Sequence, residues 1–175
     1  EMLTMLRDHA VPYLRGLSRE VILSHDIMTF GMGESAIEEL MRGKIARMEN
    51  PSLATYARPS EVRLRATAKA ENAEAAEALL APVVRETVAY LGDIVYGVDV
   101  PNLETACMAA LKKKGWTFAT AESCTGGRVA ERITALPGAS EVYRGSVVSY
   151  WTQVKADVLG IDSALLKEYG AVSEP

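Results

Sequence analysis

Histidine and cysteine are scarce in this chain, and their scarcity limits the chemistry it can perform. The 175 residues include two histidines, His9 and His25, and two cysteines, Cys107 and Cys124. A Ser-His-Asp triad in the second half would have to borrow a histidine from the first thirty residues. No His, Cys and Asp residues show metal-ligand spacing, so neither a metal nor another cofactor is expected. Two cysteines predict no structural disulfide and fit a cytoplasmic protein.

Long apolar runs and a strong net charge are also missing. No stretch approaches the roughly 18 apolar residues of a membrane-spanning helix, and no signal-peptide pattern opens the chain, so no membrane partner is expected. The net charge of −4 gives no overall attraction to nucleic acid. With 49% hydrophobic and 24% charged residues, the composition is that of an ordinary globular protein.

The first hundred residues contain a short helical segment and an α/β unit. Residues 1–17 predict an amphipathic helix that is interrupted near Pro12. Residues 18–100 alternate strand and helix patterns in the order β-α-β-β-α-β, which is typical of a split βαβ sandwich. The patterns cover residues 20–30, 35–48, 52–57, 61–69, 76–91 and 94–98. Pro82 lies inside the second helical pattern, where a kink or restart is expected.

One strand of this unit carries a basic face. Val62, Leu64, Ala66 and Ala68 alternate with Arg63, Arg65, Thr67 and Lys69. A basic face can contact nucleic acid, but a solvated sheet face is the commoner explanation. A KH domain grips nucleic acid with a GxxG loop, and we find none here. The sequence therefore argues against nucleic acid as a partner.

The second half begins with a linker and a helix, and then reaches the most informative stretch of the chain. The linker is Asp99–Asn102, and the helix that follows places Cys107 on its apolar stripe, which predicts a core position. Residues 119–127 read Ala-Thr-Ala-Glu-Ser-Cys-Thr-Gly-Gly, between an apolar run from Trp116 and a helical pattern that buries Val129, Ile133 and Leu136. Backbone N–H groups at such a corner can hold a phosphate or an oxyanion. A plain helix cap with a tight turn is the alternative.

The corner carries two candidate nucleophiles, Ser123 and Cys124, and a candidate base lies downstream. Val147–Tyr150 predicts a buried strand, and Tyr150 and Lys155 follow at its end. A serine needs a base, and lysine serves only where burial or a neighbouring cation lowers its pKa. Ser123, Tyr150 and Lys155 form a self-consistent Ser-Tyr-Lys set. An exposed helix lysine and a core tyrosine are the alternatives.

These motifs resemble a known family. Ala121–Gly127, Leu136–Ser140, Tyr143–Gly145, Val148–Tyr150 with Lys155, and Gly170–Glu174 are similar to the C-terminal domain of the CinA (competence/damage-inducible) proteins. That domain is similar to the stand-alone nicotinamide mononucleotide deamidase, PncC. The resemblance implies an amidase of the pyridine nucleotide cycle that hydrolyses nicotinamide mononucleotide to nicotinate mononucleotide and ammonia. It implies Ser123 as nucleophile, with Lys155 and Tyr150 as its activating partners.

The rest of the proposed site follows from that implied substrate. The nucleotide's phosphate would contact backbone N–H groups of Thr125, Gly126 and Gly127, together with Arg144. The family often has an asparagine where this chain has Thr152, which puts any amide contact at that position in doubt. The contribution of Cys124 stays open.

The resemblance also implies a division of the chain into three pieces. Residues 1–17 would be the C-terminal helix of an N-terminal nucleotide-binding domain, 18–100 a KH-like α/β domain, and 101–175 the first half of an α/β amidase domain that continues past Pro175. The fold class is thus α/β, with an α+β KH-like unit before the amidase part. A non-catalytic linker or homodimerisation module, beside an N-terminal domain that hydrolyses ADP-ribose, is the alternative. A nucleic-acid-binding adaptor linked to competence is the weaker one.

Overall fold

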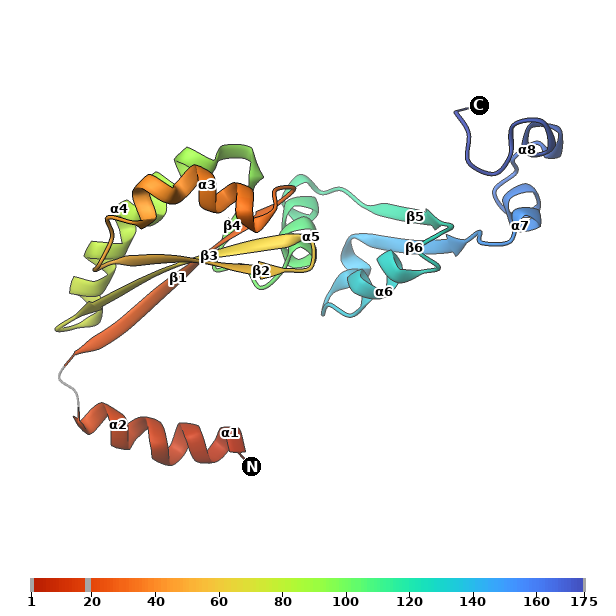
Figure 1. Ribbon diagram of the computed structural model, residues 1–175. Helices are drawn as coiled ribbons and strands as arrows, with labels where there is room; N and C mark the ends of the chain where they lie inside the picture. The colour runs from red at the N-terminus through yellow and green to blue at the C-terminus, as the bar shows by residue number, and fades with distance from the viewer. Residues whose placement is uncertain (1, 18–19, 175) are drawn as a thin grey trace. The chain divides into compact units, whose positions relative to one another are not determined.

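The computed structural model describes residues 2–17 and 20–174 and separates into two units, Glu1–Pro101 and Asn102–Pro175. Residues 2–17 are helical, as the red ribbon in Figure 1 shows. α1 (Met2–Met5), the π-helical turn η1 (Leu6–Ala10) and α2 (Val11–Leu17) follow one another without a break. The α-helical pattern is thus interrupted by the π-helical turn just before Pro12, as expected, while the chain stays helical through the proline. The apolar residues expected on its face, among them Met2, Met5 and Leu14, are exposed.

A four-stranded antiparallel sheet forms the body of the first unit. Its strands are β1 (Val21–Phe30), β2 (Ser52–Arg58), β3 (Glu61–Ala70) and β4 (Val95–Val98), in the order β2-β3-β1-β4. α3 (Glu34–Ile45) and α4 (Ala73–Leu91) cover one face of the sheet (Figure 1), and the 3-10 turn η2 (Gly92–Ile94) leads from α4 into β4. The split β-α-β-β-α-β order expected from the sequence is confirmed.

The core of this unit lies between the sheet and the two helices. Alternate residues of β1 and β3 point into it: Ile27 pairs with Leu64, and both are fully buried, as are Ala66 and Ala68. Ile37 and Met41 of α3 and Leu80 of α4 close the other side. α4 begins at an Asn72 cap that accepts the Ala75 N–H, and it runs through Pro82 as one helix.

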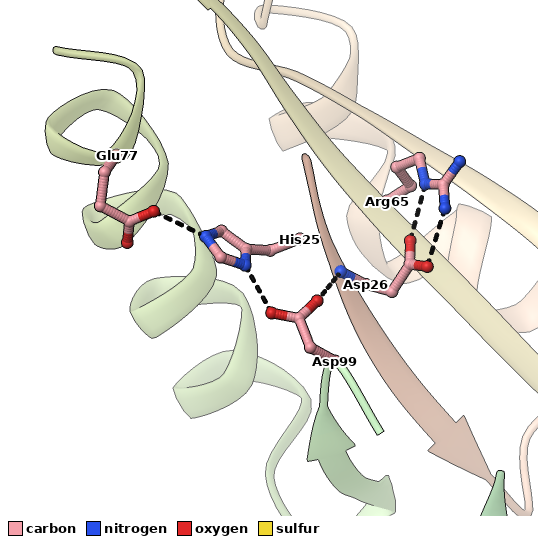
Figure 2. A network of polar contacts seen from close by, with 5 residues as sticks. All are labelled: His25, Asp26, Arg65, Glu77 and Asp99. Carbon is pink, nitrogen blue, oxygen red and sulfur yellow. Dashed lines mark hydrogen bonds and ion pairs between the residues drawn. The ribbon is translucent and has the colours of Figure 1, made fainter. Parts of the chain in front are cut away.

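The opposite side of β3 carries the basic residues, and acidic residues form ion pairs with them. Asp26 of β1 forms a two-point ion pair with Arg65, at 2.7 and 2.8 Å (Figure 2). It also lies 3.6 Å from Arg63. Lys69 pairs with Glu20 at 2.6 Å. The hydrogen bond from Arg65 lowers the pKa of Asp26, against the opposing effect of burial. The cationic face is therefore a set of internal ion pairs.

A second polar cluster connects the sheet edge to α4 and to the segment after β4. The His25 ring lies between Glu77 of α4, at 2.8 Å, and Asp99, at 2.5 Å (Figure 2). The other oxygen of Asp99 accepts the backbone N–H of Asp26. Hydrogen bonds to Glu77 and then to Asp99 raise the pKa of His25. The His25 imidazole and the Asp99 carboxylate thus join three segments that are far apart in the sequence.

The second unit contains two parallel strands among short helices. Its elements are α5 (Leu103–Lys114), β5 (Phe118–Glu122), α6 (Arg128–Thr134), η3 (Ala139–Glu141), β6 (Tyr143–Val148), α7 (Thr152–Asp157) and α8 (Ser163–Tyr169). Met108, Ile133, Val142 and Tyr143 form its small core. The mixed α/β class expected from the sequence is confirmed.

Three local expectations for this unit were wrong. The second strand covers Tyr143–Val148 instead of Val147–Tyr150, because the chain leaves the β5 ladder after Val148. Cys107 is exposed, because the buried residue of α5 is its neighbour Met108. Val129 is 40% exposed, so α6 buries mainly Ile133.

Candidate active site

The candidate site lies where the two parallel strands end. β5 and β6 are in register at Glu122 and Val148, so the residues after them, Ser123 and Ser149, leave the same edge of the sheet. The backbone N–H of Ser149 donates to the Glu122 carbonyl at 2.7 Å and fixes the two strand ends together. Ligand sites in α/β proteins typically form at the carboxyl ends of parallel strands.

α7 brings the Lys155 amine to this edge. The residue is only 7% exposed, and its Nζ lies 3.1 Å from Ser123 Oγ. The amine also donates to the Ser149 carbonyl at 2.7 Å, and it lies 3.5 Å from Ser149 Oγ. Within the described residues it has no carboxylate partner; neutral oxygens alone surround it. A buried amine beside a serine hydroxyl is the arrangement that a Ser-Lys nucleophile–base pair requires.

The turn after Ser123 leaves backbone donors open. Gly126 and Gly127 have φ values of 59° and 94°, and the Gly126 N–H donates to the Ser123 carbonyl at 3.0 Å. A side chain at Gly127 would also crowd Val148, with 3.3 Å between the added carbon and Cγ2. In the described part of the chain, the N–H groups of Cys124, Thr125 and Gly127 have no acceptor. They are the groups free to contact a ligand oxygen.

The first N–H groups of α6 are already occupied. The Glu122 side chain, in a residue only 4% exposed, accepts from Val129 N at 3.0 Å and from Ala130 N at 2.8 Å. Burial alone would raise the pKa of Glu122, but these two bonds and those from the Thr125 and Thr120 hydroxyls lower it to about 2. An internal carboxylate therefore occupies the N–H groups of Val129 and Ala130, whereas those of Thr125 and Gly127, which the sequence suggested for a phosphate, stay open.

The other predicted site residues lie farther out. Tyr150 is 73% exposed, and no hydrogen bond from its hydroxyl occurs among residues 20–174. Arg144 is near the start of β6, about 16 Å along the strand from Ser149 at roughly 3.3 Å per residue. Thr152 opens α7, and the Cys124 thiol is exposed beside Ser123. The structure brings together Ser123 and Lys155, but it does not join Tyr150 or Arg144 to them.

The sequence did not predict that two further polar residues belong to the site. Glu122 and Ser149 stand directly before Ser123 and Tyr150, inside motifs that were themselves noticed. Both residues are buried, at 4% and 3% exposure. Their only sequence signal is a polar residue at the end of an apolar strand, which does not reveal what the side chain contacts.

The described residues contain neither a metal-binding cluster nor a membrane-spanning helix. No three His, Cys, Asp or Glu side chains there gather as a metal ion would require. Within residues 2–17 and 20–174, no helix combines the length and hydropathy needed to span a bilayer.

The fold and the site define an α/β protein in which a buried lysine contacts an exposed serine at the end of two parallel strands. Comparison with known families places it more narrowly. Residues 101–175 match the CinA C-terminal domain, and residues 24–97 match the damage-inducible protein CinA KH domain. The chain belongs to the CinA family.

Individual relatives and one solved structure are similar to parts or all of the chain. A CinA-like protein of Desulfovibrio desulfuricans is 45% identical over 99% of this chain. A CinA-like protein of Gloeobacter violaceus is 44% identical over 100% of this chain. The chain covers 40% and 41% of these two proteins, so it spans about two fifths of their length. The crystal structure of the competence damage-inducible protein A (ComA) from Klebsiella pneumoniae is 36% identical, with a TM-score of 0.40, over 41% of this chain and 45% of that one.

Proposed function

We propose that this site hydrolyses the carboxamide of a pyridine nucleotide, with nicotinamide mononucleotide as substrate and ammonia as product. The observation that supports this most is the 3.1 Å separation between the buried Lys155 amine and the Ser123 hydroxyl. The resemblance of the surrounding motifs to the nicotinamide mononucleotide deamidases supplies the substrate class.

The proposed reaction has two halves. The Ser123 hydroxyl donates its proton to the lone pair of the Lys155 amine while Oγ attacks the carboxamide carbon. The free N–H of Cys124, with that of Thr125, stabilises the oxyanion that forms. The C–N bond then breaks, and Lys155 returns the proton to the departing ammonia. A water molecule gives a proton to the same amine and attacks the acyl ester. The ester C–O bond then breaks, and Lys155 returns the proton to Ser123 Oγ as nicotinate mononucleotide leaves.

The remaining residues are assigned to substrate binding. The Gly127 N–H is free to contact the nucleotide, whereas Gly126 contributes the turn that exposes it. Arg144 has no ion-pair partner among the described residues, and it would contact the phosphate of a nucleotide that lies along β6. Tyr150, which is exposed, is assigned to the mouth of the site, where its ring and hydroxyl would close over a bound substrate.

Ammonia release from nicotinamide mononucleotide tests the proposal. The chain is assayed as it stands and extended past Pro175, each with and without Ser123→Ala. Cys124→Ala is the matched control, because it removes the neighbouring exposed nucleophile. We expect release that Ser123→Ala abolishes and Cys124→Ala preserves. Release that survives Ser123→Ala, or no release from either form of the chain, refutes the proposed reaction.

A further inference from the structure

The Glu122 carboxylate is buried and lacks a cationic partner within the described residues. A buried charge is costly unless hydrogen bonds compensate it. Here the compensation comes only from uncharged hydrogen-bond donors, which are backbone N–H groups and hydroxyls. Oε2 accepts from Val129 N at 3.0 Å and from Thr125 Oγ1 at 2.8 Å, and Oε1 accepts from Ala130 N at 2.8 Å. The Thr120 and Ser146 hydroxyls each lie 3.4 Å from Oε1.

These donors come from every segment around the nucleophile. Thr120 belongs to β5, Thr125 to the turn, Val129 to the first turn of α6 and Ser146 to β6. The backbone carbonyl of Glu122 also accepts from Ser149 N at 2.7 Å and from Ser149 Oγ at 3.3 Å. Ser149 in turn holds the Lys155 amine through its own carbonyl. One residue therefore connects both partners of the Ser123–Lys155 contact.

We propose that Glu122 is a positioning residue of the site, whose carboxylate fixes the Ser123 hydroxyl in front of the Lys155 amine. Glu122 is no base itself, because both of its oxygens already accept short hydrogen bonds, and among the described residues no hydrogen bond joins either of them to Ser123. A displacement of about 1 Å between reacting groups costs on the order of a hundredfold in rate. This role rests on the amidase reaction proposed above. Its test must therefore distinguish a failure of the positioning role from a failure of that reaction.

The ionised state of Glu122 is essential to this role. A carboxylate offers only acceptors to the two backbone N–H groups and the hydroxyls. The same bonds hold its pKa at about 2 despite burial, so it stays ionised at neutral pH. Replacing one oxygen by an amide NH2 sets a donor against a donor and forces the turn to move.

The experiment measures Ser123 reactivity directly, on this 175-residue chain. Labelling by a fluorophosphonate reports how strongly the hydroxyl is activated, without any need for the nucleotide substrate. Glu122→Gln is expected to slow labelling by about a hundredfold. Glu131→Gln, on an exposed residue of α6, the helix whose N–H groups the Glu122 carboxylate accepts, is the matched control and should not change the rate.

A second pair of variants removes any ambiguity from misfolding. Thr125→Val removes one 2.8 Å donor from the carboxylate, and Thr125→Ser restores the hydroxyl. Slow labelling in the valine variant and recovery in the serine variant, both with parental circular dichroism, supports positioning. Rates that fall only as far as the folded fraction falls, or a parent that is not labelled at all, overturn it. A labelled parent that releases no ammonia from nicotinamide mononucleotide refutes the substrate assignment alone.

Discussion

Substitution of Lys155 by methionine tests the base most directly. Methionine keeps the length of the side chain but removes the amine, and with it the contacts to Ser123 Oγ at 3.1 Å and to the Ser149 carbonyl at 2.7 Å. The carbonyl that loses its donor costs about 1–3 kcal/mol. Burying an uncharged thioether in place of an amine that is only 7% exposed offsets part of that cost. Folding stability should therefore fall by no more than about 2 kcal/mol.

Catalysis should suffer much more than folding. A positioned general base contributes about 10²- to 10⁴-fold to a rate, equivalent to about 3–5 kcal/mol of barrier. We expect kcat for ammonia release to fall by that factor with KM unchanged, because the amine contacts Ser123 and not the nucleotide. Lys167→Met, on an exposed lysine of α8, is the matched control. A kcat within twofold of the parent in Lys155→Met, when Ser123→Ala is inactive, refutes the assignment of Lys155 as base.

Three further predictions concern the binding side, the cluster at the sheet edge and the core. Arg144→Ala should raise KM for nicotinamide mononucleotide about tenfold with kcat unchanged, as loss of one charge-assisted bond to phosphate predicts, and an unchanged KM contradicts this role. Because its partners raise the pKa of His25, that residue stabilises the fold fully below the unfolded value of about 6.5, and the gain is lost as pH rises through the higher folded pKa. The free energy of unfolding, measured with urea at several pH values, should show this loss in the parent and not in His25→Gln. Equal pH profiles of the two proteins contradict the prediction. Leu64→Ala, at a fully buried position, should lower the unfolding free energy by about 3–5 kcal/mol, and a loss below about 1 kcal/mol in the same assay contradicts its place in the core.

Local patterns predicted most of the first unit. The alternation from Val62 to Lys69 gave the strand and the face it buries, because side chains on a strand point to opposite sides with a period of two. The same alternation could not show that residues of the basic face form ion pairs. Asp26 lies on β1, some forty residues away in the sequence, and only the pairing of β1 with β3 places it beside Arg65.

The sequence alone determined the element order of the first unit and the presence of a small-residue turn with a serine before a helix. These features depend on neighbours within about ten residues, where periodicity, capping and turn preferences act. The tertiary structure decided which groups meet Ser123. Parallel pairing of β5 and β6 brings the ends of both strands together, so that Lys155 reaches Ser123 while Tyr150, only one residue after Ser149, turns outward. It also directed Glu122 into the fold instead of toward a ligand, because the first N–H groups of α6 and three hydroxyls converge on that buried carboxylate. Such contacts join strands and helices that no local pattern relates. They form only when the strands pair and the helices pack in the folded chain.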